Sequence, residues 1–558
     1  MSTRNRLKQE PSRVEVFLED NRNVLGILAI IGLVVYLAVL WGGFVFDDNV
    51  LVENNLLIRS LSNFWQFFTS SSQTGAGVAG SNFYRPLQYV VYALINGIFG
   101  IHSWAFHLVS VSVHIANAYL VFQLLLRLSR SRIGSFLGAL LFLVHPVNAE
   151  AVSYISGIAD PLGLLFLLIG LITFNDSAVY TWKRAVYVLI WSVLALLSKE
   201  SMVIFPLLAS VLVLYQWELY DKDERRWRVS VVGGMIGMSL MYLVLRATTL
   251  NFTGTIGLTG EENEYTTNVL VRIATFICNI WEYVKMTVAP FVLYLERPYV
   301  AYTSVLSLRG LFGIGSVAVG SVLAYRSFRE RTILFVALGW IAIAFLPVSG
   351  IIPLNAMFLE HWMYVPLVGV AIGVAAFYDS LTKEQVRALF LSIFACFLVF
   401  FSIRTIVRNT QWADPVTFYL QELEYSPNSA RVRNNLAMEY ADEEKYDAAI
   451  AEYTRAIELY DVYPQTHNNL AMVYGALGRY GDAESEFFKA LRIDNTFLYS
   501  YRGLLQLYEQ TEQTEEAAVV RALLEKVSAG SQVTQEDVDA VLELSPEGTT
   551  NGEGESSE

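Results

Sequence analysis

The sequence predicts an all-α protein: a polytopic helical membrane domain followed by an α-solenoid of short repeats. Hydrophobic residues make up 54% of the 558 residues and the mean hydropathy is +0.42, which is too apolar for one soluble domain. Apolar runs recur up to residue 407, and a 34-residue period starts after them. Charge changes at the same place, because residues 408–558 carry 11 Lys and Arg against 28 Asp and Glu, whereas the rest is slightly basic.

The apolar runs predict the membrane spans. Eleven are long enough to cross a bilayer at about 1.5 Å per residue. They cover residues 24–41, 104–126, 133–148, 157–175, 184–199, 201–218, 229–247, 306–324, 332–349, 362–379 and 386–407. The first lacks a small-residue cleavage site, so we expect a retained signal anchor. Because eleven is odd, the N-terminus and the repeats should lie on opposite sides.

Lys and Arg in the short loops predict the orientation. Arg4, Arg6 and Lys8 precede the first run, and basic loops such as 127–132 and 222–228 fall on the same side. By the positive-inside rule this side is cytoplasmic. The alternate loops are acidic or neutral, and we expect them to be extracytoplasmic. They cover residues 42–103, 145–156, 248–305 and 350–361. The repeats should lie on the same side.

Two further apolar segments break this alternation if they are counted as spans. Segments 85–100 and 268–291 would each place basic loops on the wrong side, so we expect helices lying in the outer interface. The loop 42–83 contains a Gly- and Ser-rich stretch at 70–81 and is expected to be flexible and to face the substrate.

The acidic C-terminal part has the spacing of tetratricopeptide repeats. Leucines, tyrosines and alanines recur every 34 residues, and the small alanines allow paired helices to pack closely. The recurring positions are Leu436, Leu470 and Leu504, then Tyr440, Tyr474 and Tyr508, then Ala449, Ala483 and Ala517. Residues 412–428 are expected to form a helix of a degenerate leading repeat, and Thr534 to begin a final capped helix.

Ten polar residues fall at the ends of the apolar runs, all on the predicted extracytoplasmic side. They are Asp47, Asp48, Arg85, His145, Glu150, Asp160, Lys199, Glu200, Glu360 and His361. Because a random distribution would seldom favour one face, we expect a functional site there. Asp160 lies next to the apolar run 161–172, where an unpaired carboxylate is costly, so it should have a partner.

Each of these residues also has a purely local explanation. Asp47 and Asp48 could cap a helix, as could Glu150 and Asp160. Lys199 and Glu200 could be an interfacial ion pair. His145 precedes Pro146 and could simply end a helix, because proline disfavours the helical conformation at the residue before it.

Several other classes of site are excluded or disfavoured. The two cysteines, Cys278 and Cys396, lie in apolar stretches, which favours buried inert thiols and excludes disulfides and a cysteine metal site. His102, His107 and His114 lack metal-binding spacing, and any metal requirement stays unknown. The acidic tail argues against a nucleic-acid partner.

Six motifs, in this order, resemble those of the transmembrane and tetratricopeptide repeat-containing O-mannosyltransferases and their prokaryotic relatives, a family with the multispanning GT-C glycosyltransferase fold. They are Phe46-Asp47-Asp48, Tyr84-Arg85-Pro86-Leu87, the run His145-Pro146-Val147-Asn148-Ala149-Glu150-Ala151-Val152, Gly157-Ile158-Ala159-Asp160, Ser198-Lys199-Glu200 and Glu360-His361-Trp362-Met363-Tyr364-Val365-Pro366. Asn148 and His361 depart from the family pattern, and His361 puts phosphate binding at its position in doubt near neutral pH.

The resemblance implies that a sugar, such as mannose, moves from a polyprenyl-phosphate donor to a Ser or Thr hydroxyl of a protein acceptor. Asp47 or Asp48 would be the base for the attacking hydroxyl, with inversion at the sugar. Arg85 and Lys199, with His361 as a partial substitute, would hold the lipid phosphate. The donor-binding set would also include His145, Glu150, Asp160, Glu200, Glu360 and Tyr364.

We therefore expect four segments. They are a cytoplasmic segment at 1–23, a GT-C-like transmembrane glycosyltransferase domain at 24–407, a tetratricopeptide repeat domain at 408–544 that binds the protein acceptor, and a disordered acidic tail at 545–558. The alternative is a transporter or a non-catalytic membrane scaffold that displays the repeats. A transporter should carry ionisable groups near the bilayer midplane, whereas these lie at one face.

Overall fold

Helices form all the regular structure in the described part of the chain, and the chain divides into two units, Met1–Asp414 and Pro415–Glu558. The computed structural model describes residues 13–71, 74–76, 82–129, 131–176, 180–252, 263–297, 300–354, 356–529 and 533–544. The first twelve residues, most of the predicted flexible stretch 70–81 and the predicted tail 545–558 lie outside these ranges. The two units are described separately.

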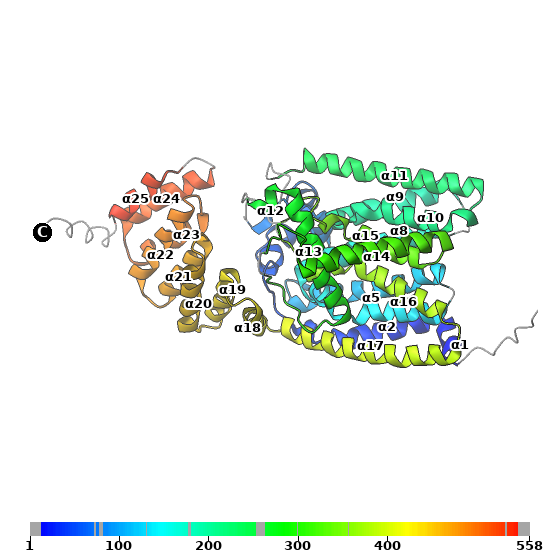
Figure 1. Ribbon diagram of the computed structural model, residues 1–558. Coiled ribbons are helices and arrows are strands. Elements are labelled where there is room, and N and C mark those ends of the chain that lie inside the picture. The colour runs from blue at the N-terminus through cyan, green and yellow to red at the C-terminus, as the bar shows by residue number, and fades with distance from the viewer. Residues whose placement is uncertain are drawn as a thin grey trace, which may run out of the picture. The chain divides into compact units, whose positions relative to one another are not determined.

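Helices, most of them long and packed side by side, make up the first unit (Figure 1). They are α1 (Arg13–Glu19), α2 (Asn21–Val35), α3 (Phe64–Phe67), α4 (Pro86–Phe99), α5 (Ser103–Leu128), α6 (Arg132–Val144), α7 (Ala149–Ser153), α8 (Ala159–Asn175), α9 (Trp182–Ser198), α10 (Phe205–Gln216), α11 (Lys222–Ala247), α12 (Glu264–Thr267), α13 (Val269–Val288), α14 (Leu308–Glu330), α15 (Leu334–Ala344), α16 (Pro366–Ser380) and α17 (Glu384–Trp412). Short 3-10 segments, labelled η, and one π-helical segment, η2, connect several of them.

The number of helices long and apolar enough to span a membrane is smaller than the eleven expected. Six qualify in the described residues, or seven if α6 and the bent segment Pro146–Ser153, at 49°, count as one span. The other four expected spans are shorter helices: α2, α9, α15 and α16. Hydropathy reports composition and not where a helix breaks, and α2, for example, breaks at Tyr36 before η1 (Leu37–Trp41).

A continuous apolar core holds the bundle together. Residues such as Phe122, Phe142, Leu168 and Val368 are fully buried in it. Helices α6 and α16 approach closely because Gly138 has no side chain: a Cβ there would lie 2.6 Å from the Ala371 carbonyl oxygen. Small residues at such crossings are typical of membrane helix pairs.

The two segments expected in the interface are both helical. Pro86–Phe99 forms α4, a short apolar helix, and Val269–Val288 forms α13. Arg272 of α13 is buried and donates hydrogen bonds to the carbonyls of Gly350, Tyr265 and Thr266. The bond to Gly350 ties α13 to the segment that follows α15, and the other two tie it to α12.

The second unit is a stack of helix pairs with the expected tetratricopeptide arrangement. Its helices are α18 (Pro415–Tyr425), α19 (Ala430–Asp442), α20 (Tyr446–Leu459), α21 (Pro464–Ala476), α22 (Tyr480–Ile493), α23 (Leu498–Gln510), α24 (Thr514–Ser528) and α25 (Gln535–Leu544). Ala449, Ala483 and Ala517 are all buried where paired helices meet. The final helix begins as predicted, since Thr534 and Asp537 bond each other's backbone N–H groups.

Candidate functional site

Asp47 and Asp48 lie in one short turn but face different surroundings. The turn follows η1 and begins at Phe46, which has a positive φ of 48° that is uncommon for an aromatic residue. The Asp47 side chain is exposed, and its carboxylate accepts no hydrogen bond from any residue that the structure describes. Its backbone N–H donates to the Tyr154 hydroxyl at 3.1 Å. The Asp47 carboxylate is thus held in place by its backbone and open to a substrate.

Asp48 is fully buried, and its carboxylate stabilises the turn through hydrogen bonds. One carboxylate oxygen accepts bonds from the Ser156 backbone N–H at 2.8 Å and hydroxyl at 2.5 Å, and the other accepts from the Val45 N–H at 3.2 Å. Burial raises the pKa of Asp48 to about 7, although these bonds oppose the rise. With both oxygens engaged, Asp48 is placed to position the turn rather than to meet a substrate.

Two ion pairs join the ends of α4, α8 and α9. The Nε of Arg85, which precedes α4, donates to Glu200 at 3.2 Å. The Nζ of Lys199, which ends α9, lies 2.5 Å from Asp160 in the first turn of α8. The expectation that Asp160 has a partner is confirmed. The local alternative of a Lys199–Glu200 pair is replaced by these two pairs, which cross between helices.

His361 extends this network to Glu150. Its Nδ1 lies 2.5 Å from one Glu150 oxygen, its backbone N–H donates to the other at 3.0 Å, and its Nε2 lies 4.0 Å from Asp160. Glu150 is buried in α7, and His361 belongs to the 3-10 segment η11 (Glu360–Met363). We call Arg85, Glu150, Asp160, Lys199, Glu200 and His361 the charged cluster. It assembles six of the predicted residues from five segments.

A bonded path connects the charged cluster to the aspartate turn. Gln88, in the first turn of α4 after Arg85, donates to the Tyr92 hydroxyl at 2.8 Å and to the Ser156 carbonyl at 3.0 Å. Ser156 is the residue that bonds Asp48. The aspartates and the cluster therefore lie at the same end of the bundle, which we call the polar end.

Glu360 belongs to a neighbouring pair with an arginine that the sequence analysis missed. Its Oε1 accepts from Arg297 at 2.9 Å and from the Tyr294 backbone N–H at 2.6 Å. The Arg297 guanidinium also lies 4.5 Å from the Phe358 ring centre. The sequence contained a signal that could have identified Arg297, because Arg297 is followed directly by proline, as Arg85 is, in a loop of the same predicted side. The sequence analysis also missed Arg408, which is buried in α17.

Two predicted site residues lie in the packed interior instead. His145 is buried, its Nε2 lies 3.0 Å from the Thr287 carbonyl and its Nδ1 accepts from the Val147 N–H at 3.3 Å. The Tyr364 hydroxyl lies 2.8 Å from His114 Nδ1 and accepts from Asn117 at 3.1 Å. Both residues fix the segments that carry the charged cluster.

The described residues contain no group of three or more His, Cys, Asp or Glu side chains arranged to hold a metal ion. The cysteines differ from one another: Cys278 is buried, as expected, but Cys396 lies on the exposed surface of α17, so the expectation of a buried thiol there is wrong. Neither cysteine takes part in the charged cluster.

Comparison with known proteins identifies relatives of both units. The tetratricopeptide repeat family matches residues 430–462 and 464–497. Protein O-mannosyl-transferase TMTC4 of Homo sapiens is 24% identical over 476 residues, which cover 74% of this chain and 63% of the human protein. Protein O-mannosyl-transferase F38B6.6 of Caenorhabditis elegans is 25% identical over 457 residues, covering 80% and 64%. The chain thus spans less than two thirds of these relatives.

Solved structures give weaker matches. The Archaeoglobus fulgidus oligosaccharyltransferase, crystallised with a tethered acceptor peptide, has a TM-score of 0.41 at 12% identity and covers 77% of this chain and 58% of its own. ArnT from Cupriavidus metallidurans, bound to undecaprenyl phosphate, has a TM-score of 0.37 at 12% identity and covers 83% and 79%.

Proposed function

The chain is a distant homologue of the protein O-mannosyl-transferases that carry tetratricopeptide repeats, and from this premise we propose that it is a GT-C-type membrane glycosyltransferase. It would move a mannose-type sugar from a polyprenyl-phosphate donor to a Ser or Thr hydroxyl of a protein acceptor. The transfer would invert the sugar's anomeric centre and take place at the polar end, on the extracytoplasmic face.

The proposal rests on the hydrogen-bond donors of the charged cluster's cations that bond no described residue. The Arg85 side chain is 17% exposed and bonds Glu200 through Nε alone, and its two terminal nitrogens donate to no described residue. Lys199 bonds Asp160 and no other described side chain. A guanidinium with free terminal donors is suited to a phosphate, because it can bind two oxygens at once. The cluster can therefore hold a lipid phosphate at the membrane surface.

Asp47 supplies the second requirement, a base for the acceptor hydroxyl. Its exposed carboxylate can accept a proton, whereas both oxygens of Asp48 are already engaged. Direct attack by the hydroxyl on C1 of the sugar releases the lipid phosphate toward Arg85 and Lys199, so no covalent sugar–enzyme intermediate is needed. The contact between Glu150 and His361 would hold α7 and η11 together next to the site.

Asp47→Asn tests this assignment in purified protein reconstituted with polyprenyl-phosphate mannose and a Ser/Thr peptide. Transfer should fall by about 100-fold or more, the usual scale for loss of a general base, while donor binding is retained. The matched variant Asp48→Asn should lower the unfolding temperature and leave more activity than Asp47→Asn. Full activity of Asp47→Asn would exclude Asp47 as the base. Wild-type protein that binds donor but transfers nothing to any peptide would favour the scaffold alternative.

The proposed membrane topology keeps all eleven spans, with the four shorter helices crossing as well. Helix α2 together with η1 covers residues 21–41, about 30 Å of helix, which matches the hydrocarbon core. The N-terminus would be cytoplasmic and the repeats extracytoplasmic.

Membrane-impermeant labelling tests the orientation. A single cysteine introduced in an exposed turn of the repeats, for instance at Gly478, in a chain without Cys278 and Cys396, should react in intact cells. A cysteine at Asp223, exposed in the first turn of α11 on the predicted cytoplasmic side, should react only after lysis. The reverse pattern would overturn both the orientation and the extracytoplasmic site.

A further inference from the structure

A cavity of about 470 Å³ opens at the far end of α10 from the charged cluster. Helix α10 leads from η8 (Glu200–Ile204), which starts at the cluster, to η9 (Trp217–Leu219), which borders the cavity. The opposite wall comes from the end of α14 and the start of α15. None of the residues assigned to sugar transfer borders it.

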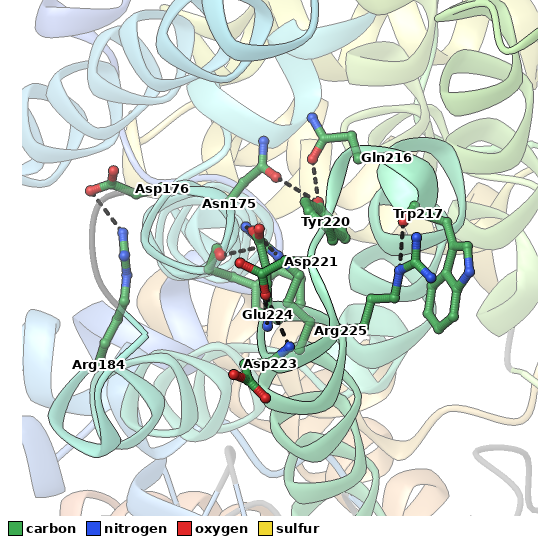
Figure 2. A network of polar contacts seen from close by, with 12 residues as sticks. Asn175, Asp176, Arg184, Gln216, Trp217, Tyr220, Asp221, Asp223, Glu224 and Arg225 are labelled. Atoms are coloured by element: carbon green, nitrogen blue, oxygen red, sulfur yellow. Dashed lines mark hydrogen bonds and ion pairs between the residues drawn. The ribbon is translucent and has the colours of Figure 1, made fainter.

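The wall formed by η9 is fixed by a network of polar contacts. The Arg225 Nε donates to the Trp217 carbonyl, a bond drawn in Figure 2, at 3.0 Å. The guanidinium lies 5.0 Å from the Trp217 ring centre. The Tyr220 hydroxyl donates to Gln216, and Asp221 accepts two backbone N–H bonds at the start of α11. The Trp217 ring is therefore held in one place at the mouth of the cavity.

A buried ion pair anchors this network to the bundle. Arg228 is 1% exposed, donates to Glu224 at 2.6 Å and to the Phe174 carbonyl at 2.7 Å, and lies 4.2 Å from the Tyr220 ring centre. Breaking one partner of such a pair is costly, so this corner is rigid. The cavity next to it is a preformed feature of the fold.

The lining of the cavity combines an apolar wall with a cationic rim. Leu214, Phe328 and Phe335 supply apolar surface. At the rim, Arg331 pairs with Glu218 at 2.9 Å, which neutralises that carboxylate. Arg329 is exposed and forms no ion pair or hydrogen bond with any residue that the structure describes. The lining therefore has a net formal charge of one positive unit, which Arg329 supplies.

Lipid is the molecule expected next to this rim. Only 11% of the apolar stretch of α14 is buried inside the protein, so its outer surface, which includes Val322 and Leu323, needs an apolar environment. In the proposed orientation this end of α14 faces the cytoplasmic leaflet, where basic pockets between helices bind lipid head groups. Trp217 has the place of an aromatic residue at the membrane interface.

We propose that this cavity binds an anionic phospholipid of the cytoplasmic leaflet. The phosphodiester, with one negative charge, would be held by Arg329 and by the remaining donors of Arg331, and an acyl chain would lie along Leu214, Phe328 and Phe335. The bound lipid would join α10, α14 and α15 at the end opposite the charged cluster. The inference depends on the proposed orientation but not on the proposed reaction.

Native mass spectrometry of the full-length protein in detergent tests the site, with phosphatidylglycerol, phosphatidylethanolamine and phosphatidylcholine of identical acyl chains as probes. Phosphatidylglycerol should bind at least about fivefold more tightly than the other two, since all three carry the phosphodiester but the head-group cations of the other two are repelled by Arg329. Arg329→Gln should remove this preference. Arg331→Gln should reduce it partly, because Glu218 then loses its partner.

Arg326→Gln is the matched control, because Arg326 is an exposed arginine near the same end of α14 that does not line the cavity. It should leave the preference unchanged. Equal losses in Arg326→Gln and Arg329→Gln would show general attraction to basic surface and overturn the site. So would equal binding of all three lipids by the wild type, or stronger binding of polyprenyl phosphate than of phosphatidylglycerol. Sugar transfer is not measured here, so failure of the proposed reaction cannot mimic these outcomes.

Discussion

The ion pairs of the charged cluster and those of the repeat unit differ in how far apart their partners lie in the sequence. In the membrane unit, Arg85 and Glu200 are separated by 115 positions, and His361 and Glu150 by 211. In the repeat unit, Arg433 and Glu452 are only 19 positions apart, on the paired helices α19 and α20. Repeat pairs follow from the local helix hairpin. The pairs of the charged cluster exist only because remote segments meet, which costs desolvation free energy and suggests a role beyond stability.

The two arginines also differ in how fully they are engaged. Arg433 bonds Glu452 through one terminal nitrogen, and its Nε and other terminal nitrogen both donate to the Pro427 carbonyl. Among the residues that the structure describes, the Arg85 guanidinium bonds through Nε alone. Every nitrogen of the Arg433 guanidinium is already bonded within the protein, whereas both terminal nitrogens of Arg85 donate to no residue that the structure describes. This difference separates a structural arginine from a candidate phosphate ligand.

The largest expected effect on sugar transfer is the difference between two single variants, each of which removes one of these two charges. Arg85→Gln should lower sugar transfer by about 100-fold, the scale seen when one preorganised donor to developing charge is lost, and should weaken donor binding. Arg433→Gln should leave transfer within about twofold and destabilise only the repeats. Arg85→Lys, which keeps the charge but loses the planar fork, should be intermediate. Initial rates in proteoliposomes measure all three, and equal rates for the two Gln variants would erase the distinction between the units.

Separating the two units sharpens the comparison further. A chain that ends at Asp414, the boundary between the units, should retain donor binding and transfer to a short peptide. Transfer to a full-length protein acceptor should fall about tenfold, because the concave surface of a tetratricopeptide stack can bind a long segment of the acceptor that a short peptide lacks. If the repeats instead brace the membrane unit, donor binding and both transfer rates should fall together, and the unfolding temperature should drop as well.

Sequence reasoning predicted what depends on periodicity and missed what depends on contact. The 34-residue period placed Leu436, Leu470 and Leu504 in the cores of successive repeats, and all three are buried. Helix composition is visible in sequence, but helix breaks are not. The break at Tyr36 and the 49° bend after Val144 therefore left fewer long helices than the eleven apolar runs implied.

The charged cluster shows the same division. The cost of a lone carboxylate near the hydrocarbon predicted a partner for Asp160. Which partner it has could not be predicted, because Lys199 and Glu200 are adjacent in sequence and only the folded chain sends one to Asp160 and the other to Arg85. The exposures of Asp47 and Asp48 differ for a similar reason. Adjacent side chains point in different directions, and the position of Ser156 decides which one is buried.

A smaller effect is expected from the one histidine of the repeats, His467, which lies between two carboxylates. Its Nδ1 is 2.5 Å from Glu486 and its Nε2 is 2.7 Å from Asp461. Burial alone would lower the pKa of His467, but the bonds to Glu486 and Asp461 outweigh it and raise the pKa. The stabilisation is fully present below the unfolded value of about 6.5 and is lost as pH rises through the folded-state pKa.

Amide hydrogen exchange of α21 and α22 should therefore be slower at pH 6 than at pH 8.5 after correction for the intrinsic rate. Burial alone would raise the pKa of Glu486, but the bonds to His467 and Lys489 outweigh it and lower the pKa. The stabilisation from Glu486 therefore has the opposite pH dependence and is lost as pH falls below about 4.5. His467→Gln should abolish the difference between pH 6 and pH 8.5. A pH dependence that survives in His467→Gln would assign it to other groups.

The smallest effect concerns the turn inside each repeat, where Glu444, Gly478 and Glu512 recur 34 residues apart with φ values of 59°, 72° and 61°. This left-handed conformation suits glycine and strains other residues by roughly 1–2 kcal/mol. Glu444→Gly and Glu512→Gly should each stabilise the repeats by about 1 kcal/mol, since relief of this strain exceeds the greater freedom that glycine gives the unfolded chain. Gly478→Ala is the matched control. A Cβ there would meet no atom within 4 Å, so its destabilisation, of about 1 kcal/mol, would report backbone strain alone. Urea denaturation followed by circular dichroism measures the three changes, and a loss of stability in both Glu→Gly variants would contradict the strain argument.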